Sequence, residues 1–352
     1  FNAFIVVPTS VLRVKMDFKA IAMSNFFSTL LSGVLGAYTA IIGLGIWALI
    51  IQLLSKSFIQ MIFLCYQCEW KPKFKFFKAS FIEMYKYAFA IFGTSCITKI
   101  TGEGISVFVA KILTPYNLGL FTRANQFASL AGTSLGSIFS TVLFPAFSSL
   151  KKESQEFYLL MKKMVVYQSL FIIPLFMFLA VLSKPIVIIL LTDKWSGVIP
   201  ILQILCIGRI LSTISIATEQ AICSVGRSDL EFKQQFYKLV IKILFIIIGF
   251  KFGIIGIAVA DAASTLLSFF ITNYYANKCI NFSNCLQLKL ITPFFFSSLL
   301  ASYVGYCFVQ SCSSVWLQML IGTLTMCSTY ILILFIIKRD IMLQVLQHMC
   351  LI

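Results

Sequence analysis

The sequence predicts an all-α polytopic membrane protein with about ten transmembrane helices and a partial one. Hydrophobic residues make up 60% of the 352 residues and charged residues only 11%, and the mean hydropathy is +0.96. A soluble domain is about half apolar and a quarter charged, so this chain needs the bilayer as its solvent. A bilayer admits only helices or closed barrels. The apolar runs are about twenty residues long, which is helix length and twice that of a barrel strand.

Polar breaks and turn residues divide the apolar runs into the expected helices. These are Asn2–Leu12, which is partial, Ala20–Ile42, Ile46–Tyr66, Tyr87–Lys111, Leu118–Phe147, Phe157–Leu182, Lys184–Leu191, Val198–Val225, Phe232–Phe250, Ile254–Asn277, Leu288–Val309 and Val315–Ile337. Pro174 is expected to kink its helix. The stretch Lys71–Lys86 mixes lysines with aromatic residues and is expected to form an amphipathic helix at the membrane surface.

The net charge of +16 reflects the membrane topology rather than a nucleic-acid partner, because the basic residues lie in short clusters between apolar runs. The segments assigned to the cytoplasmic side carry 20 lysines and arginines, Lys238 and Lys242 among them. The opposite loops carry four, which are Lys111, Lys184, Lys194 and Lys251. This bias predicts a cytoplasmic C-terminus.

The sequence offers little to an enzyme. The one histidine, His348, lies in the C-terminal tail, and the Cys65-x-x-Cys68 pair has no second pair of ligands nearby. There is no Ser/His/Asp constellation and no phosphate-binding glycine loop. We therefore expect no catalytic activity, no metal and no cofactor.

An internal repeat predicts two similar halves. Arg13-x4-Phe18-Lys19 and Arg227-x4-Phe232-Lys233 each precede an apolar helix and a glycine-containing turn. Parallel repeats of this kind occur in transporters, with the binding site between the halves. We expect the end of an N-terminal lobe at 1–70, a linker at 71–86, a six-helix C-terminal lobe at 87–280, and two further helices with a cytoplasmic tail at 281–352. On this reading the chain is truncated at its N-terminus.

Four short elements resemble a known family. These are Gly43–Leu49, Gly119–Phe127, Pro200–Leu205 and Gly226–Asp229. Their order and spacing resemble the polysaccharide repeat-unit flippases (Wzx-type, lipopolysaccharide and colanic-acid exporter branch) of the multidrug/oligosaccharidyl-lipid/polysaccharide exporter superfamily. Phe121 departs from the pattern, because tyrosine is common there.

The resemblance implies a two-lobed fold of twelve core helices plus two C-terminal ones, of which the first three and part of the fourth are absent here. It implies a transporter of the bacterial inner membrane that moves undecaprenyl-diphosphate-linked oligosaccharide to the periplasmic leaflet by alternating access. Glycosyltransferases and a polysaccharide polymerase would then be its partners, together with the membrane lipids.

Charged residues inside the expected helices are the candidate site residues, since each costs about 2.5–3.5 kcal/mol at a helix centre. Arg209, Lys99 and Arg123 are the candidates for binding the anionic substrate. The acids Glu103, Asp261 and Glu219 are the candidates for ion coupling or charge pairing. A Lys99–Glu103 pair within one helix and an Arg123–Glu103 pair across a turn are structural alternatives.

Two other functions stay open at this point. A cation-coupled multidrug exporter of the same superfamily would favour a cavity dominated by acids, and the helix-embedded charges here show a slight basic excess. A membrane-embedded glycosyltransferase or polymerase would need larger periplasmic loops. A separate stripe of small residues, Ala128, Gly132, Gly136 and Ser140, predicts close helix packing or a sliding surface.

Overall fold

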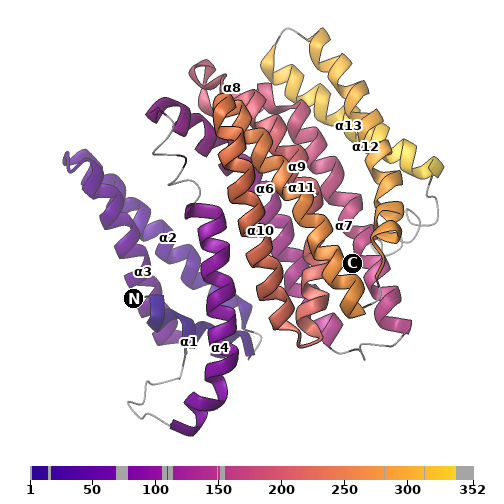
Figure 1. Cartoon of the computed structure of the whole chain (residues 1–352). Helices are drawn as coiled ribbons and strands as arrows, with labels where there is room; N and C mark the ends of the chain where they lie inside the picture. The colour runs from indigo at the N-terminus through magenta and orange to yellow at the C-terminus, as the bar shows by residue number, and fades with distance from the viewer. Residues whose placement is uncertain are drawn as a thin grey trace. The chain divides into compact units, whose positions relative to one another are not determined.

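The computed structural model describes residues 2–14, 17–68, 78–104, 109, 114–148, 150, 155–280, 282–312 and 314–337, and the regular structure in these ranges is helical. The chain divides into two compact units, Phe1–Phe81 and Ile82–Ile352 (Figure 1). Within the described ranges, seven apolar segments are long enough to cross a bilayer, and one of them, Asp229–Ile280, contains two helices. The chain is therefore a multi-pass membrane protein, as predicted.

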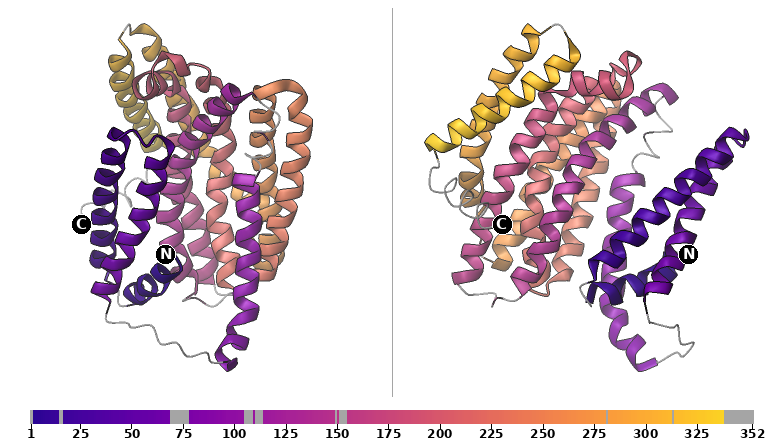
Figure 2. Two further views of the ribbon diagram at one scale, coloured as in Figure 1. Left: turned by 90° about the vertical axis from the view of Figure 1, so that its left-hand side faces the viewer. Right: turned by 180° about the vertical axis from the view of Figure 1, so that it is seen from behind.

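The first unit is built on a helical hairpin. It contains α1 (Asn2–Val14), α2 (Phe18–Ile41) and α3 (Ile46–Gln67). The Asp17 carboxylate caps α2 by accepting a hydrogen bond from the Ala20 amide at 3.1 Å. Gly43 and Gly45 turn the chain between α2 and α3 with φ values of 90° and 52°, which glycine adopts at little cost. Figure 2 shows the two helices side by side.

The second unit is a helical bundle with α9 at its centre. Its elements are α4 (Lys78–Lys99, which begins just before the division), the π-helical turn η1 (Ile100–Gly104), α6 (Pro115–Ser148), α7 (Gln155–Val181), α8 (Ser183–Leu191), η2 (Asp193–Trp195), α9 (Val198–Ser224), α10 (Ser228–Gly249), η3 (Phe250–Phe252), α11 (Gly253–Ile280), α12 (Asn284–Ser311) and α13 (Val315–Ile337). Helices α6, α7 and α11 pack against α9, and α10 packs against α11 (Figure 1).

Small residues allow the helices around α9 to approach closely. A Cβ added to Gly136 of α6 would come 2.7 Å from Ile216 Cδ1 of α9. A Cβ added to Gly132 of α6 would lie 3.4 Å from the Thr213 Oγ1, which also belongs to α9. Gly132 and Gly136 of the small-residue stripe thus lie close to α9, which agrees with the packing role, one of the two roles predicted for the stripe.

Helices α12 and α13 form a pair at the edge of the second unit (Figure 2). The Tyr330 hydroxyl of α13 donates a hydrogen bond to the Leu170 carbonyl of α7 at 2.9 Å. On other sides of α13, Leu332 and Ile336 are 63% and 81% exposed. Large apolar side chains exposed to this extent are what a lipid-facing helix presents.

The main differences from the expected elements concern α4. The helix begins at Lys78 rather than at Tyr87, so it includes part of the segment expected to be a separate amphipathic linker. The earlier part of that segment and the C-terminal tail lie outside the described residues. The helix also ends earlier than expected, because it passes into the π-helical turn at Ile100. Helix α7 continues through Pro174.

Candidate functional site

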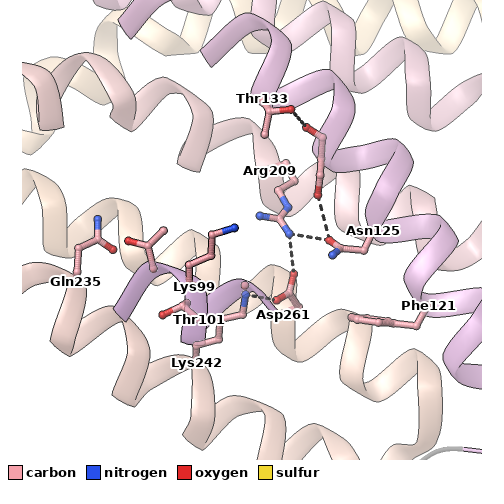
Figure 3. A pocket seen from close by; sticks show the side chains of 12 residues that line it. Lys99, Thr101, Phe121, Asn125, Thr133, Arg209, Gln235, Lys242 and Asp261 are labelled. Atoms are coloured by element: carbon pink, nitrogen blue, oxygen red, sulfur yellow. Dashed lines mark hydrogen bonds and ion pairs between the residues drawn. The ribbon is translucent and has the colours of Figure 1, made fainter. Parts of the chain in front are cut away.

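A polar cavity of about 490 Å³ lies within the second unit, between α4 with η1, α6, α9, α10 and α11 (Figure 3). Its size falls in the range of about 300–1,000 Å³ that is typical of small-molecule sites. The residues that line it are Thr98, Lys99, Thr101, Gly102, Phe121, Asn125, Ser129, Thr133, Arg209, Gln235, Lys242 and Asp261. π-Helical turns such as η1 are frequent at functional sites.

The close approach of α9 and α11 positions the central charges. A Cβ at Gly208 of α9 would lie 2.6 Å from the Cα of Ala262 on α11. The Thr265 hydroxyl of α11 donates a hydrogen bond to the Gly208 carbonyl at 3.2 Å. Because Gly208 precedes Arg209 and Ala262 follows Asp261, this contact sets the guanidinium and the carboxylate beside each other.

Asp261 pairs with two cations. One carboxylate oxygen lies 2.9 Å from the Lys242 Nζ, and the other lies 3.7 Å from an Arg209 Nη2. The same Arg209 Nη2 donates a hydrogen bond to the Asn125 Oδ1 of α6 at 2.8 Å. The Asp261 side chain is 6% exposed, against 25% for Arg209. The carboxylate is thus buried beneath a guanidinium that still reaches the cavity.

The cavity wall carries an excess of positive charge. Among the described residues, Lys99, Arg209 and Lys242 line it together with one carboxylate, that of Asp261. Figure 3 shows the three cationic side chains converging on the space beside Asp261. The Lys242 and Asp261 side chains are 11% and 6% exposed, so their charges interact more strongly than charges at a surface would. The cavity is therefore suited to an anion, and a guanidinium is suited to phosphate oxygens in particular.

Two further cavities share Arg209 with the first. One of about 180 Å³ also contains an ion pair in which the Lys238 Nζ lies 2.6 Å from a Glu219 oxygen. The other, of about 620 Å³, runs along α6 and α9 and is rich in hydroxyl groups. Those hydroxyls belong to Thr98, Ser129, Thr133, Ser137, Ser140, Ser212 and Thr213. The charged cavity thus borders a wall that can hydrogen-bond a polar, uncharged group.

The structure brings four of the six predicted site residues together. Arg209, Lys99 and Asp261 line the main cavity, and Glu219 lines the two that adjoin it. Arg123 does not line these cavities. Its side chain is exposed, donates to the Gln126 Oε1 at 2.9 Å and lies 5.9 Å from the centre of the Trp195 ring.

The predicted ion pairs of Glu103 with Lys99 and Arg123 stay untested, because the side chain of Glu103 lies outside the described residues. Glu219 also has a partner that the sequence did not suggest. The sequence predicts ion coupling or charge pairing for Glu219 without naming a partner, and the structure pairs it with Lys238.

Four residues of the cavities were not predicted as site residues, namely Asn125 of α6 and Gln235, Lys238 and Lys242 of α10. The two lysines were counted with the positive charges of a cytoplasmic segment and were not considered as site residues, and the structure places both within α10, lining the cavities. A signal was present in their spacing. Glu231, Gln235, Lys238 and Lys242 recur every three or four residues, which places them on one face of a helix.

Known proteins share this fold. Lipid II flippase MurJ, in an inward closed conformation, superimposes with a TM-score of 0.70 at 18% sequence identity, over 90% of this chain and 67% of that one. At this identity the likeness shows the fold.

Curated relatives resemble the chain in sequence. The succinoglycan biosynthesis transport protein ExoT of Rhizobium meliloti (strain 1021) is 24% identical over 200 residues, which are 57% of this chain and 40% of that protein. The lipopolysaccharide biosynthesis protein WzxC of Escherichia coli (strain K12) is 24% identical over 286 residues, which are 76% of this chain and 57% of that protein. The chain thus spans about half the length of these relatives.

A family model matches the N-terminal part of the chain. Residues 1–200 fit the model described as polysaccharide biosynthesis protein, and this match covers more than half of the 352 residues. The chain therefore belongs to the polysaccharide biosynthesis protein family.

Proposed function

We propose that the protein is a flippase of the bacterial inner membrane, with its C-terminus in the cytoplasm. Its cargo is an undecaprenyl-diphosphate-linked oligosaccharide, which it moves from the cytoplasmic to the periplasmic leaflet for the synthesis of a surface polysaccharide. The observation that carries this proposal is a cavity inside a membrane protein that is lined by Lys99, Arg209 and Lys242. The names of the related transport proteins and of the flippase with the same fold support it.

The chemistry of the cavity fits such a cargo. A diphosphate carries negative charge that the apolar part of a bilayer does not solvate, and Arg209 can bind its oxygens through several donors. The sugars need hydrogen bonds rather than charge, and the adjoining hydroxyl-rich cavity provides them. Moving the lipid breaks no covalent bond, so the protein needs no catalytic group.

The residues take the following roles in this proposal. Arg209 and Lys99 bind the diphosphate, with Lys242 beside them. Asp261 holds the Lys242 side chain in place through an ion pair, and Glu219 does the same for Lys238. Arg123 lies outside the cavity, so a direct contact with the cargo would have to occur in a state of the transport cycle other than this one. Alternating access to the two sides of the membrane is part of the proposal.

A multidrug exporter of the same superfamily would carry cationic drugs. Such a cargo calls for a cavity in which acids outnumber bases. The main cavity has three cationic side chains and one carboxylate among the described residues that line it. The charge of the wall therefore favours an anionic cargo.

Replacing Arg209 tests the proposal. In cells that depend on the full-length protein for surface polysaccharide, Arg209→Ala should lower the polysaccharide at least tenfold while the variant still inserts into the membrane. Arg209→Lys keeps the charge and should retain part of the activity. Arg227→Ala is the matched control, because Arg227 pairs with Asp229 at an exposed site outside the cavities. Normal polysaccharide with Arg209→Ala, Lys99→Met and Lys242→Met alike would refute the anion-binding cavity.

A further inference from the structure

Asp261 occupies the position in which an anionic ligand of Arg209 and Lys242 would be expected. Each of its carboxylate oxygens faces one of the two cations, at 3.7 Å and 2.9 Å. The carboxylate comes from α11, while the cations come from α9 and α10. The protein thus carries an anion of its own within its cationic cavity.

A buried ion pair of this kind affects how strongly the cavity holds another anion. Removing two charges from water costs free energy, and their mutual attraction offsets that cost. An incoming anion that binds Arg209 and Lys242 has to weaken their attraction to Asp261. The carboxylate therefore lowers the affinity of the site for the anion and favours its departure.

We propose that Asp261 is a built-in counter-anion, which the diphosphate of the cargo displaces from Arg209 and Lys242 and which pairs with them again when the cargo leaves. This inference rests on the proposed function. It assigns Asp261 as a positioning residue that sets how readily the cargo is released.

The surroundings of Arg209 fit an exchange of partners. Its Nη2 is shared between Asn125 and Asp261, and the longer of the two contacts is the one to Asp261. Its Nε is buried and has no hydrogen-bond partner among the described residues. The guanidinium thus keeps Asn125 as an anchor when its contact with Asp261 is broken. A diphosphate has enough oxygens to replace both contacts of the Asp261 carboxylate.

The test compares three variants of the full-length protein, purified in detergent. Asp261→Asn removes the counter-anion. Glu219→Gln is the matched control, because it removes the carboxylate from the neighbouring Lys238 pair. Arg209→Ala removes the proposed anion site. For each variant, the thermal unfolding midpoint is measured against rising concentrations of inorganic pyrophosphate and, separately, of undecaprenyl diphosphate, and export is measured in cells.

Asp261→Asn should bind undecaprenyl diphosphate about tenfold more tightly than the wild type, a coupling within the usual range of about 5- to 150-fold. Without ligand it should unfold at a lower temperature, because Lys242 loses its partner, and ligand should raise its midpoint more than that of the wild type. Its export should nevertheless fall, since release is slower. Tighter binding of pyrophosphate as well would identify the diphosphate as the group that competes with Asp261. A response to the lipid alone would contradict displacement by the diphosphate.

Other outcomes separate the inference from the proposed function. If the wild type binds the diphosphate lipid through Arg209, and Asp261→Asn binds it no more tightly, the inference fails while the proposed function stands. If Glu219→Gln tightens binding as much as Asp261→Asn, the effect is one of net charge and the inference also fails. If the wild type binds no diphosphate, both are wrong.

Discussion

Gly208 of α9 lies directly against Ala262 of α11, with no room for a side chain at position 208. The contact also sets the spacing of the next pair of residues, Arg209 and Asp261. Gly208→Ala should therefore both destabilise the protein and lower export. Overpacking of a close contact typically costs about 1–3 kcal/mol, which the unfolding midpoint of the purified protein would reveal.

The same substitution at Gly33 of α2 provides the control, because a Cβ there would meet nothing within 4 Å. Gly33→Ala should be neutral or slightly stabilising, since alanine favours a helix by up to about 1 kcal/mol over glycine. Equal effects at the two positions would mean that the α9–α11 contact does not set the stability.

We predict that Lys242 acts through the cavity and not only as one of the positive charges that orient the protein in the membrane. Lys242→Met leaves Asp261 buried with Arg209 as its one described cationic partner, and export of surface polysaccharide should fall about tenfold or more, as for the loss of a buried charge partner. Lys278→Met changes an exposed lysine in the last turn of α11 and should leave export nearly unchanged. Export assays at matched protein levels in the membrane would compare the two variants. Equal losses would mean that Lys242 contributes only to the positive charge that orients the protein in the membrane.

The Glu219–Lys238 pair should show strong coupling in a double-mutant cycle. The side chains are 24% and 10% exposed, so each single change, Glu219→Gln or Lys238→Met, leaves a largely buried charge without its partner. We expect a coupling free energy of about 1–3 kcal/mol, measured by unfolding of the purified variants. The exposed Arg227–Asp229 pair should couple by less than about 1 kcal/mol. Similar values for both pairs would contradict the burial argument.

Arg123 should act through Trp195. If the cation–π contact accounts for its role, Arg123→Ala and Trp195→Ala should be non-additive by about 0.5–1 kcal/mol in stability. Diphosphate binding by Arg123→Ala should equal that of the wild type, in contrast to Arg209→Ala. A loss of binding as large as that of Arg209→Ala would instead support the earlier prediction that Arg123 contacts the cargo.

The helices were predictable because each is a long apolar run that ends at polar or glycine residues. The range Val315–Ile337 agrees with α13 at both ends. The end of α4 was not predictable, because apolar residues continue past Lys99 and the π-helical turn at Ile100–Gly104 carries no distinct sequence signal. The beginning of α4 was placed late, since Lys78 and Lys86 resemble a surface segment.

The site was predictable only in part. A charge in the middle of a hydrophobic run, such as Arg209, points to a cavity because it is costly in lipid. Lys242 also lies within an apolar run, but it was grouped with several nearby lysines that fit the positive-inside rule, and its helical spacing from Gln235 and Lys238 was not used. Asn125 is neutral and stands within a motif of many small and polar residues, so that only the fold shows it facing Arg209.

Arg209 borders each of the three polar cavities described above. A negatively charged group that travels from one of these spaces to the next can therefore keep hold of one guanidinium throughout. The group would then stay bound to Arg209 while it moves, and no step would leave its charge between two separate binding sites. Continuous contact with one guanidinium would keep the free-energy barriers between the cavities low. It also means that substitution of Arg209 alone would affect every step of the movement.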